Sequence, residues 1–321
     1  MIDDLVIIVP TFNRPDYLRR VVRYYSSFPC RVYICDSSAE DAGIKSDGNI
    51  IYRWAPEKNF NKKVLDTVEE TSADFYALSP DDDFIKEETL MECLTFLRDH
   101  PDHSLAGGKQ VFFKEGLGEG FYSTDAMNRM HGINEIPAEP KEDYVRYFWS
   151  HYQNILWSVF RKKAIRDAFA ALNSCNYDNG NFVELSLGLE SLRNGRIYIS
   201  SNALNFREII TREHWGSTTP TISRDHMKSE PALAEDIRRF HDYYRGDPFA
   251  EFCLDCHLDA APRESLSERM TKRIPVSVRK SFLFAPLRFA SRLLTRSKKT
   301  AGKDPVFPDD VMEAKIAQAL K

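Results

Sequence analysis

Residues 75–84 read FYALSPDDDF, an apolar run that ends in a proline and three consecutive aspartates. The first half, Phe75–Ser79, has the length and composition of a buried strand. Adjacent carboxylates repel one another, and a divalent cation such as Mg²⁺ or Mn²⁺, which prefers carboxylate oxygens, offsets that repulsion. The alternative is that the aspartates only favour the N-terminus of the next helix, expected at Glu87–His100. Their position directly after a strand leads us to favour a metal site at Asp81–Asp83.

Strand-like and helix-like segments alternate on both sides of this stretch. Strands are expected at Leu5–Val9, Arg31–Cys35, Asn49–Trp54 and Ser104–Phe113, and helices at Asp16–Ser27, Asn61–Thr71 and Glu87–His100. This alternation predicts a mostly parallel sheet with helices on both faces. Ligands of such sheets bind beyond the carboxyl ends of the strands. Polar residues of Thr11–Arg14, Asp36–Ser38 and Asp81–Asp83 all follow strand ends, so we expect them at one site.

The second half of the chain is less regular. Residues 114–142 are rich in Gly, Pro and acidic residues, which predicts a loop over the substrate. Helices are expected at Asp143–Trp149, Arg161–Leu172, Asn181–Arg193 and from about Glu230 to Leu258, and strands at Ile155–Phe160 and Arg196–Ser200. We therefore expect an α/β domain over residues 1–225 and a helical C-terminal extension over residues 226–321.

Charge is unevenly distributed along the 321 residues. The formal net charge is -4, yet residues 262–303 carry twelve Lys/Arg against two Asp/Glu. Basic residues interleaved with Phe and Leu are typical of a helix that lies on an anionic membrane surface. The alternative is a helix that packs on the body of the protein with its basic side in solvent. The acidic body and the absence of a nucleic-acid motif argue against nucleic acid as a partner.

The N-terminus and the cysteines indicate the compartment. Met1–Asp4 begins no secretory signal, and no window reaches 18 uninterrupted apolar residues. The six cysteines are scattered, as in proteins with reduced thiols. Cys253–His257 matches a haem-attachment pattern, but that chemistry needs export, so we expect structural thiols. The expected location is cytoplasmic, with peripheral attachment to the inner face of the membrane through residues 262–303.

Three motifs together carry a resemblance to a known family. Val9–Pro15 reads VPTFNRP, Asp36–Ser38 reads DSS and Ser79–Phe84 reads SPDDDF. Alone, the first is equally compatible with a strand-to-helix turn and the second with an Asx turn. In succession they resemble the GT-A glycosyltransferases of family 2, and most closely a bacterial subgroup with a divergent C-terminal half. The resemblance implies a GT-A, Rossmann-like fold in which residues 1–225 bind the nucleotide-sugar and perform catalysis.

The resemblance also implies roles for particular residues. The donor would be held by Pro10, Thr11, Asn13, Arg14, Asp36, Asp81 and Asp82, and the metal by Asp83 with Asp81. The family often has Asn-x-Gly before its third helix, where this chain has Lys62 and Lys63. Lys63 is expected to approach a phosphate of the donor, and the alternative is a solvated helix face.

The remaining assignments concern the acceptor side. Inverting members of the family use a carboxylate about eleven residues before a glycine, and Glu184 stands at that distance from Gly195. The family's Glu-Asp pair is absent here, and Asp178 is the second candidate for the base. His214 resembles a histidine that some GT-A enzymes use as a third metal ligand. Asn154 and Trp157 are expected to line the sugar pocket.

The sequence therefore predicts a glycosyltransferase that depends on Mn²⁺ or Mg²⁺. It would move a sugar, with inversion, from a nucleotide diphosphate sugar, UDP-type favoured, to a hydroxyl of a glycan or lipid-linked glycan. Bacterial surface polysaccharide or glycolipid assembly would suit this activity. One alternative is a sugar-phosphate nucleotidyltransferase, although its Gly-rich loop is missing. Another is a non-catalytic carbohydrate- or membrane-binding protein that keeps the fold, in which Asp83→Ala would leave function intact.

Overall fold

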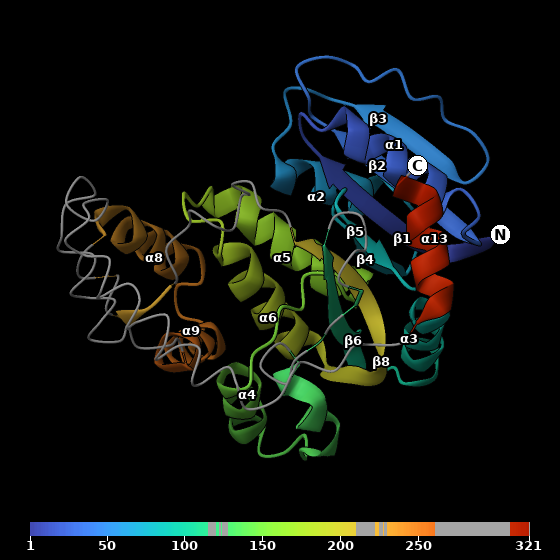
Figure 1. Cartoon of the computed structure of the whole chain (residues 1–321). Coiled ribbons are helices and arrows are strands. Elements are labelled where there is room, and N and C mark those ends of the chain that lie inside the picture. The colour runs from blue at the N-terminus through green and yellow to red at the C-terminus, as the bar shows by residue number, and fades with distance from the viewer. Residues whose placement is uncertain are drawn as a thin grey trace, which may run out of the picture.

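The computed structural model describes residues 1–114, 120–121, 123, 128–209, 222–224, 227, 230–260 and 309–320. Within these ranges the chain forms an eight-stranded sheet with helices on both faces (Figure 1). The predicted α/β fold class with a helical C-terminal part is confirmed. Two predicted features, His214 and the basic segment 262–303, lie outside the described residues.

The strand order of the sheet is β3-β2-β1-β4-β7-β6-β8-β5. The bounds are β1 Ile2–Thr11, β2 Cys30–Asp36, β3 Ile50–Trp54, β4 Phe75–Leu78, β5 Asp83–Ile85, β6 His103–Lys114, β7 Val159–Arg161 and β8 Arg196–Ile209. Strands β3, β2, β1 and β4 run parallel, as the sequence predicts, whereas β7 and β5 run antiparallel to their neighbours. Thr11 is in register with Asp36, so the carboxyl ends of β1 and β2 lie side by side.

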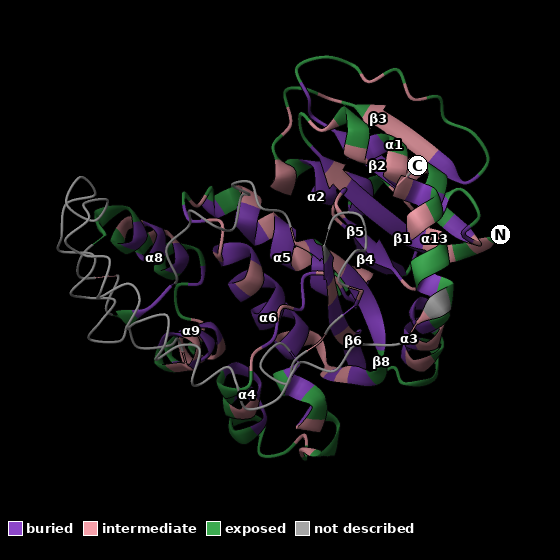
Figure 2. Cartoon of the chain, in the orientation of Figure 1, coloured by how far each residue is buried: buried purple, intermediate pink, exposed green. Residues whose placement is uncertain are grey.

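Apolar side chains of β1 alternate between two hydrophobic cores. Leu5, Ile7 and Val9 belong to one core, and Val6 and Ile8 belong to the core on the opposite face. Helices α1 (Pro15–Tyr25), α3 (Glu87–Asp99) and α13 (Asp310–Leu320) contribute to the first core, and α2 (Phe60–Glu70), α4 (Lys141–Ser150), α5 (Lys162–Cys175) and α6 (Phe182–Asn194) to the second. Both sides of the sheet are therefore covered, and Figure 2 shows its central strands as buried.

The C-terminal helices pack at two separate places. Helix α8 (Pro231–Tyr243) packs on α5, and α9 (Pro248–Ala260) packs on α4 and α6, at the side of the molecule away from β1 (Figure 1). Helix α13 instead lies against α1 and α3. Its Met312 is buried, where the Tyr24 hydroxyl donates a hydrogen bond to its sulfur, and Asp309 forms an ion pair with Lys86. No helix in the described ranges is long and apolar enough to cross a membrane.

Four elements differ from the sequence expectation. The predicted strand Ile155–Phe160 is wrong in its first part, because a turn in which the Ser158 amide bonds to the Ile155 carbonyl precedes β7. Strand β8 continues to Ile209 instead of ending at Ser200, and β5 pairs with its second half. A 3₁₀ helix, η2 (Arg129–Glu135), occupies part of the expected loop. In each case long-range pairing or packing decides the local structure.

The cysteine motif lies within helix α9. Cys253 and Cys256 are buried, and all six cysteines of the chain are free thiols. The imidazole of His257 packs edge-on to the indole of Trp149, with ring centroids 4.7 Å apart. These contacts belong to the hydrophobic core, in keeping with the structural role expected for the thiols.

Candidate active site

The ends of β1 and β4 are joined through a buried hydrogen bond. The Thr11 hydroxyl donates to Oδ2 of Asp81, with an oxygen–oxygen distance of 2.6 Å. Thr11 is the last residue of β1, and Asp81 follows β4, which pairs with β1 in parallel. Two of the predicted donor-binding residues, seventy positions apart, are therefore in direct contact.

Arg14 connects the first motif to two of the three aspartates. Its Nη1 donates to Asp81 at 2.8 Å and to Asp82 at 2.7 Å, and its guanidinium lies 5.2 Å from the centre of the Tyr17 ring. Charge-assisted hydrogen bonds of this kind are about twice as strong as neutral ones. Because Arg14 immediately precedes α1, which begins at Pro15, the start of that helix fixes the position of its guanidinium.

The loop after β1 also contacts the loop after β2. Asn13 has a φ of 55°, a left-handed conformation that asparagine tolerates better than most residues. Its backbone amide donates to the Ser38 hydroxyl at 2.7 Å, and its side-chain oxygen accepts from the Ala39 amide. The predicted site residue Pro10 lies in register with Cys35, one step before Asp36. The first two motifs thus form a single hydrogen-bonded surface.

Asp36 is held mainly by its own loop. Its Oδ1 accepts hydrogen bonds from both the amide and the hydroxyl of Ser38, and its Oδ2 accepts from the Tyr52 hydroxyl at 2.9 Å. The bond to the Ser38 amide is the Asx-turn geometry left open by the sequence. Trp54 closes the same loop, because its indole Nε1 donates to the Ser38 carbonyl at 2.9 Å.

Lys63 lies inside this site rather than on a solvated helix face. Its side chain is buried at the N-terminal half of α2. The ammonium donates to the Thr11 carbonyl at 2.8 Å and to the Ser37 hydroxyl at 2.9 Å. Burial lowers the pKa of Lys63, while Asp36 and Asp81 act in the opposite direction. The neighbouring Lys62 is the exposed one of the pair and bonds to Asp66 of its own helix.

Asp83 is held by residues of β8, whereas Arg14 holds Asp81 and Asp82. Asp83 begins β5, and its Oδ1 accepts from the Glu208 amide at 3.0 Å. Its Oδ2 accepts from Nε of Arg207 at 3.2 Å. Burial raises the pKa of Asp83, and the Asp82 charge adds to this effect, whereas Arg207 opposes it. Burial, with the same Asp82 charge, raises the pKa of Asp81 to about 6 despite its contact with Arg14.

These pKa shifts bear on whether the aspartates suit a divalent cation. Asp81 and Asp83 are 3% and 4% exposed, and burial together with the Asp82 charge disfavours their ionised form, an effect that a bound cation would offset. Hard carboxylate oxygens fit Mg²⁺ or Mn²⁺, which take further ligands from phosphates and water. Among the described residues no three His, Cys, Asp or Glu side chains form a complete metal-binding group. Asp81 and Asp83 offer the carboxylate type that these cations take, and metal binding here stays a prediction.

Glu184 lies in the first turn of α6 and contacts another predicted site residue. Its Oε1 accepts a hydrogen bond from Nδ2 of Asn154 at 2.7 Å. Burial raises the pKa of Glu184 above its usual value, and the Tyr152 hydroxyl and the Arg207 guanidinium oppose that shift. A carboxylate with a raised pKa is a stronger base once ionised, as general-base catalysis requires.

Asp178 and Trp157 have different surroundings. The Asp178 carboxylate is exposed and pairs with Arg239 of α8 at 3.5 Å, so the described contacts place it with the C-terminal helices. Trp157 lies closer to the predicted site, because its carbonyl accepts from the Asn205 side chain of β8 at 2.8 Å. Its indole Nε1 is buried, and no group in the described part of the chain accepts a hydrogen bond from it.

Sequence reasoning missed the contribution of β8. Arg207 and its neighbour Glu208 fix Asp83, yet the predicted strand ended before them. The signal was present in the alternation of buried Leu204 and Phe206 with the polar Asn205 and Arg207, which is the period of a strand. Arg207 is also joined to Gln110 of β6, a residue with no motif to mark it.

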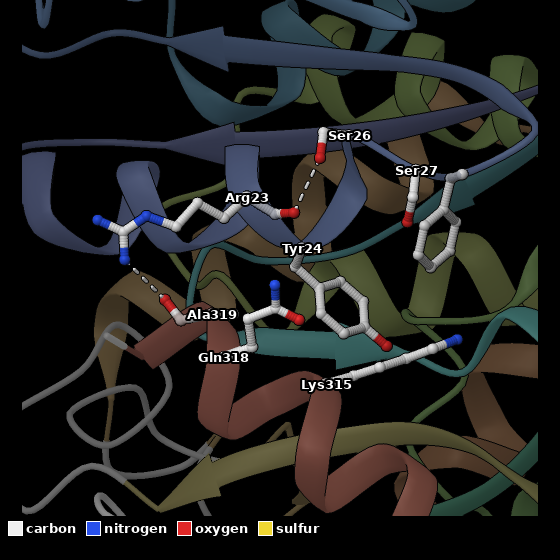
Figure 3. Close-up of a pocket in the computed structure, with 8 residues that line it drawn as sticks. Arg23, Tyr24, Ser26, Ser27, Lys315, Gln318 and Ala319 are labelled. Atoms are coloured by element: carbon white, nitrogen blue, oxygen red, sulfur yellow. Dashed lines mark hydrogen bonds between the residues drawn. The ribbon is translucent and has the colours of Figure 1, made fainter.

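A cavity of about 460 Å³ lies elsewhere, between α1 and α13. Arg23, Tyr24 and Lys315 are among the residues that line it, and Nη1 of Arg23 donates to the Ala319 carbonyl at the end of α13 (Figure 3). Helix α1 separates the cavity from Arg14 by about 15 Å, given a rise of 1.5 Å per residue. The cavity shares no residue with the predicted site and belongs to the packing of α13.

Comparison with known proteins identifies the fold. No protein-family model matches the sequence, and no curated protein matches it. A structure of S. aureus TarS 1-349 in complex with UDP-GlcNAc superposes with a TM-score of 0.51 at 17% identity, covering 85% of this chain and 77% of that chain. Another structure of S. aureus TarS gives 0.51 at 15% identity, covering 85% and 46%. This chain therefore shares its fold with these TarS structures.

Proposed function

We propose that this protein is a metal-dependent, inverting glycosyltransferase of the GT-A family 2 type that takes its sugar from a nucleotide diphosphate donor. The observation that carries the proposal is the contact of Thr11 and Arg14 with Asp81, at the carboxyl ends of β1 and β4. In open α/β sheets that edge is where nucleotides bind. A fold shared with TarS, which binds UDP-GlcNAc in one of its structures, supports a UDP-type donor.

The donor would bind across the loops that follow β1, β2 and β4. Asn13, Asp36 and the backbone at Pro10 would contact the nucleoside, and Arg14 would contact its ribose or phosphates together with Asp81 and Asp82. The buried ammonium of Lys63 donates a hydrogen bond to the Thr11 carbonyl, and this positive charge next to the donor-binding loop supports a role for Lys63 near the diphosphate. Asn154, and Trp157 with its buried Nε1 that has no acceptor among the described residues, would line the sugar pocket.

Asp83, Asp81 and His214 would hold Mn²⁺ or Mg²⁺ in this proposal. Bound there, the cation would act as a Lewis acid that stabilises the negative charge of the departing diphosphate. Asp83 presents a carboxylate fixed at both oxygens by β8, so its orientation is set before any donor binds. Preorganised charge of this kind needs no rearrangement during the reaction.

Glu184 would act as the general base, and Asp178 is the weaker candidate. The Glu184 carboxylate would take the proton from the acceptor hydroxyl as that oxygen attacks the anomeric carbon from the face opposite the diphosphate, which gives inversion. Its raised pKa and its bond to Asn154 support this role. The ion pair of Asp178 with Arg239 speaks against that residue as the base.

The cellular setting is also part of the proposal. A glycan or lipid-linked glycan would be the acceptor, in the assembly of bacterial surface polysaccharide or glycolipid. The basic segment 262–303 would attach the protein peripherally to an anionic membrane on the cytoplasmic side. In the sequence, that segment comes between α9, which ends at Ala260, and α13, which begins at Asp310, and both helices pack on the body of the protein.

Calorimetry with a panel of nucleoside diphosphates tests the donor site. We expect one nucleotide, UDP first, to bind in the presence of Mn²⁺ and to bind at least tenfold more weakly with EDTA or with Asp83→Asn. Asp255→Asn is a matched control, because among the described residues this exposed aspartate of α9 pairs with Arg224 alone. Absence of binding for every nucleotide would refute the transferase proposal and favour a non-catalytic protein with this fold.

A further inference from the structure

Gln110 of β6 is buried between Arg207, which contacts Asp83, and Asn154, which contacts Glu184. It is 3% exposed, and it uses both ends of its side-chain amide. Its Oε1 accepts a hydrogen bond from Nη1 of Arg207 at 3.1 Å, and its Nε2 donates to the Asn154 carbonyl at 2.5 Å. A buried side chain with both a donor and an acceptor in use is fixed in one orientation.

The partners of Gln110 extend the connection in both directions. On one side Arg207 also donates to Asp83, the proposed metal ligand. On the other side Asn154 donates from its side chain to Glu184, the proposed base. An unbroken series of hydrogen bonds therefore joins Asp83 to Glu184, and Gln110 is its central member.

Further hydrogen bonds hold the backbone of Gln110 and the side chain of Asn154. The backbone amide of Gln110 donates to Oδ1 of Asn128 at 2.7 Å, and Nδ2 of Asn128 donates to the backbone carbonyl of Gln110 at 3.2 Å. The Asn154 oxygen Oδ1 accepts from the Leu156 amide at 2.9 Å. That bond turns Nδ2 of Asn154 toward Glu184, so the orientation of the base depends on where residue 154 lies.

We propose that Gln110 is a positioning residue that fixes the carboxylate of Glu184 relative to Asp83, through Arg207 on one side and Asn154 on the other. The inference rests on the proposed function, since it assigns the two ends to base and donor site. A reacting group must be held within a fraction of an ångström, and a displacement of about 1 Å can cost about 100-fold in rate. Gln110 itself touches neither substrate nor metal in this scheme.

Methionine at position 110 keeps the length of the side chain and removes both hydrogen bonds. The assay is hydrolysis of UDP-GlcNAc with Mn²⁺, for which water replaces the unidentified acceptor. We expect Gln110→Met to lower kcat by about 10- to 100-fold with KM changed less than about twofold, because Asp83 keeps its bond to the Glu208 amide whereas Asn154 loses the bond that places Glu184.

A double-mutant cycle with Glu184→Gln separates positioning from a general loss of structure. If Gln110 acts through Glu184, Gln110→Met lowers the residual rate of the Glu184→Gln variant by less than about threefold, so the two losses do not add. Asn49→Leu is the matched control, because Asn49 is also a buried amide side chain, and its Nδ2 donates to the carbonyls of Tyr25, Phe28 and Cys30, none of which contacts Glu184 among the described residues. Its effect is expected to be the same in both backgrounds.

Crystal structures of wild type and Gln110→Met give a readout that does not depend on activity. We expect the contact between Nδ2 of Asn154 and Oε1 of Glu184 to lengthen beyond hydrogen-bonding distance in the variant. An unchanged contact, or losses that add fully in the cycle, would overturn the inference. A wild type that neither binds nor hydrolyses the donor would instead refute the proposed function, and the structural comparison would still decide whether Gln110 positions Glu184.

Discussion

His257 provides a quantitative prediction about stability and pH. It lies on α9 with its ring against Trp149, and burial lowers the pKa of His257 from 6.5 to about 4. A histidine that is neutral in the folded protein but protonates when unfolded costs stability as the pH falls below 6.5. With a pKa of 6.5 in the unfolded chain and about 4 in the folded protein, His257 lowers the free energy of unfolding by about 2 kcal/mol at pH 5 and by about zero at pH 7.5.

Urea unfolding at pH 7.5 and pH 5 measures this contribution. We subtract the free energy of unfolding of wild type from that of His257→Gln at each pH. This difference is expected to be about 2 kcal/mol more favourable to the variant at pH 5 than at pH 7.5. His257→Phe keeps an aromatic ring against Trp149 and serves as the control. It is expected to show the same shift, whatever its absolute stability. A difference that stays constant between the two pH values would refute the reasoning that His257 is neutral when folded.

The other predictions concern catalysis, the donor site and the C-terminal helix. Glu184→Gln is expected to lower kcat by about 10²- to 10⁴-fold while UDP affinity, measured by calorimetry, stays within about twofold. Thr11→Val keeps the shape of the side chain but removes its bond to Asp81. Since such a charged hydrogen bond contributes about 1.5–3 kcal/mol to stability, the free energy of unfolding should fall by about that amount, and Mn²⁺-dependent nucleotide binding, measured by calorimetry, should weaken because Asp81 is no longer held in place. Met312→Ala should lower the free energy of unfolding by about 2–5 kcal/mol, because Met312 is fully buried against Tyr24; an unchanged unfolding midpoint would contradict the packing of α13.

Together these experiments separate three parts of the molecule. The proposed donor site is built by the loops after β1 and β4, the proposed base lies on α6, and α13 contacts the C-terminal end of α1. Met312→Ala is therefore expected to act on stability, and Glu184→Gln on rate. A variant that changed both to the same degree would indicate that these regions are less independent than their contacts suggest.

Local sequence determined the N-terminal half of the fold. The runs at Leu5–Val9 and Phe75–Ser79 became β1 and β4 because their apolar side chains can be buried only on both faces of a central sheet. The aspartates directly after β4 then had to lie at the carboxyl edge, where Thr11 and Arg14 also emerge. For this part of the site, position along the chain already implied position in space, since parallel strands end at the same edge.

Only the tertiary structure decided the other half of the site. Strand β5, the second half of β8 and the bond between Gln110 and Arg207 arise from pairing between residues more than ninety positions apart. Strand propensity depends on the neighbours a segment finds, so a short run such as Asp83–Ile85 carries no local signal. The return of α13 to α1 is of the same kind. The sequence by itself therefore determined that Thr11, Arg14 and the aspartates meet at one edge of the sheet, and the tertiary structure decided which residues hold Asp83 and Glu184 in place.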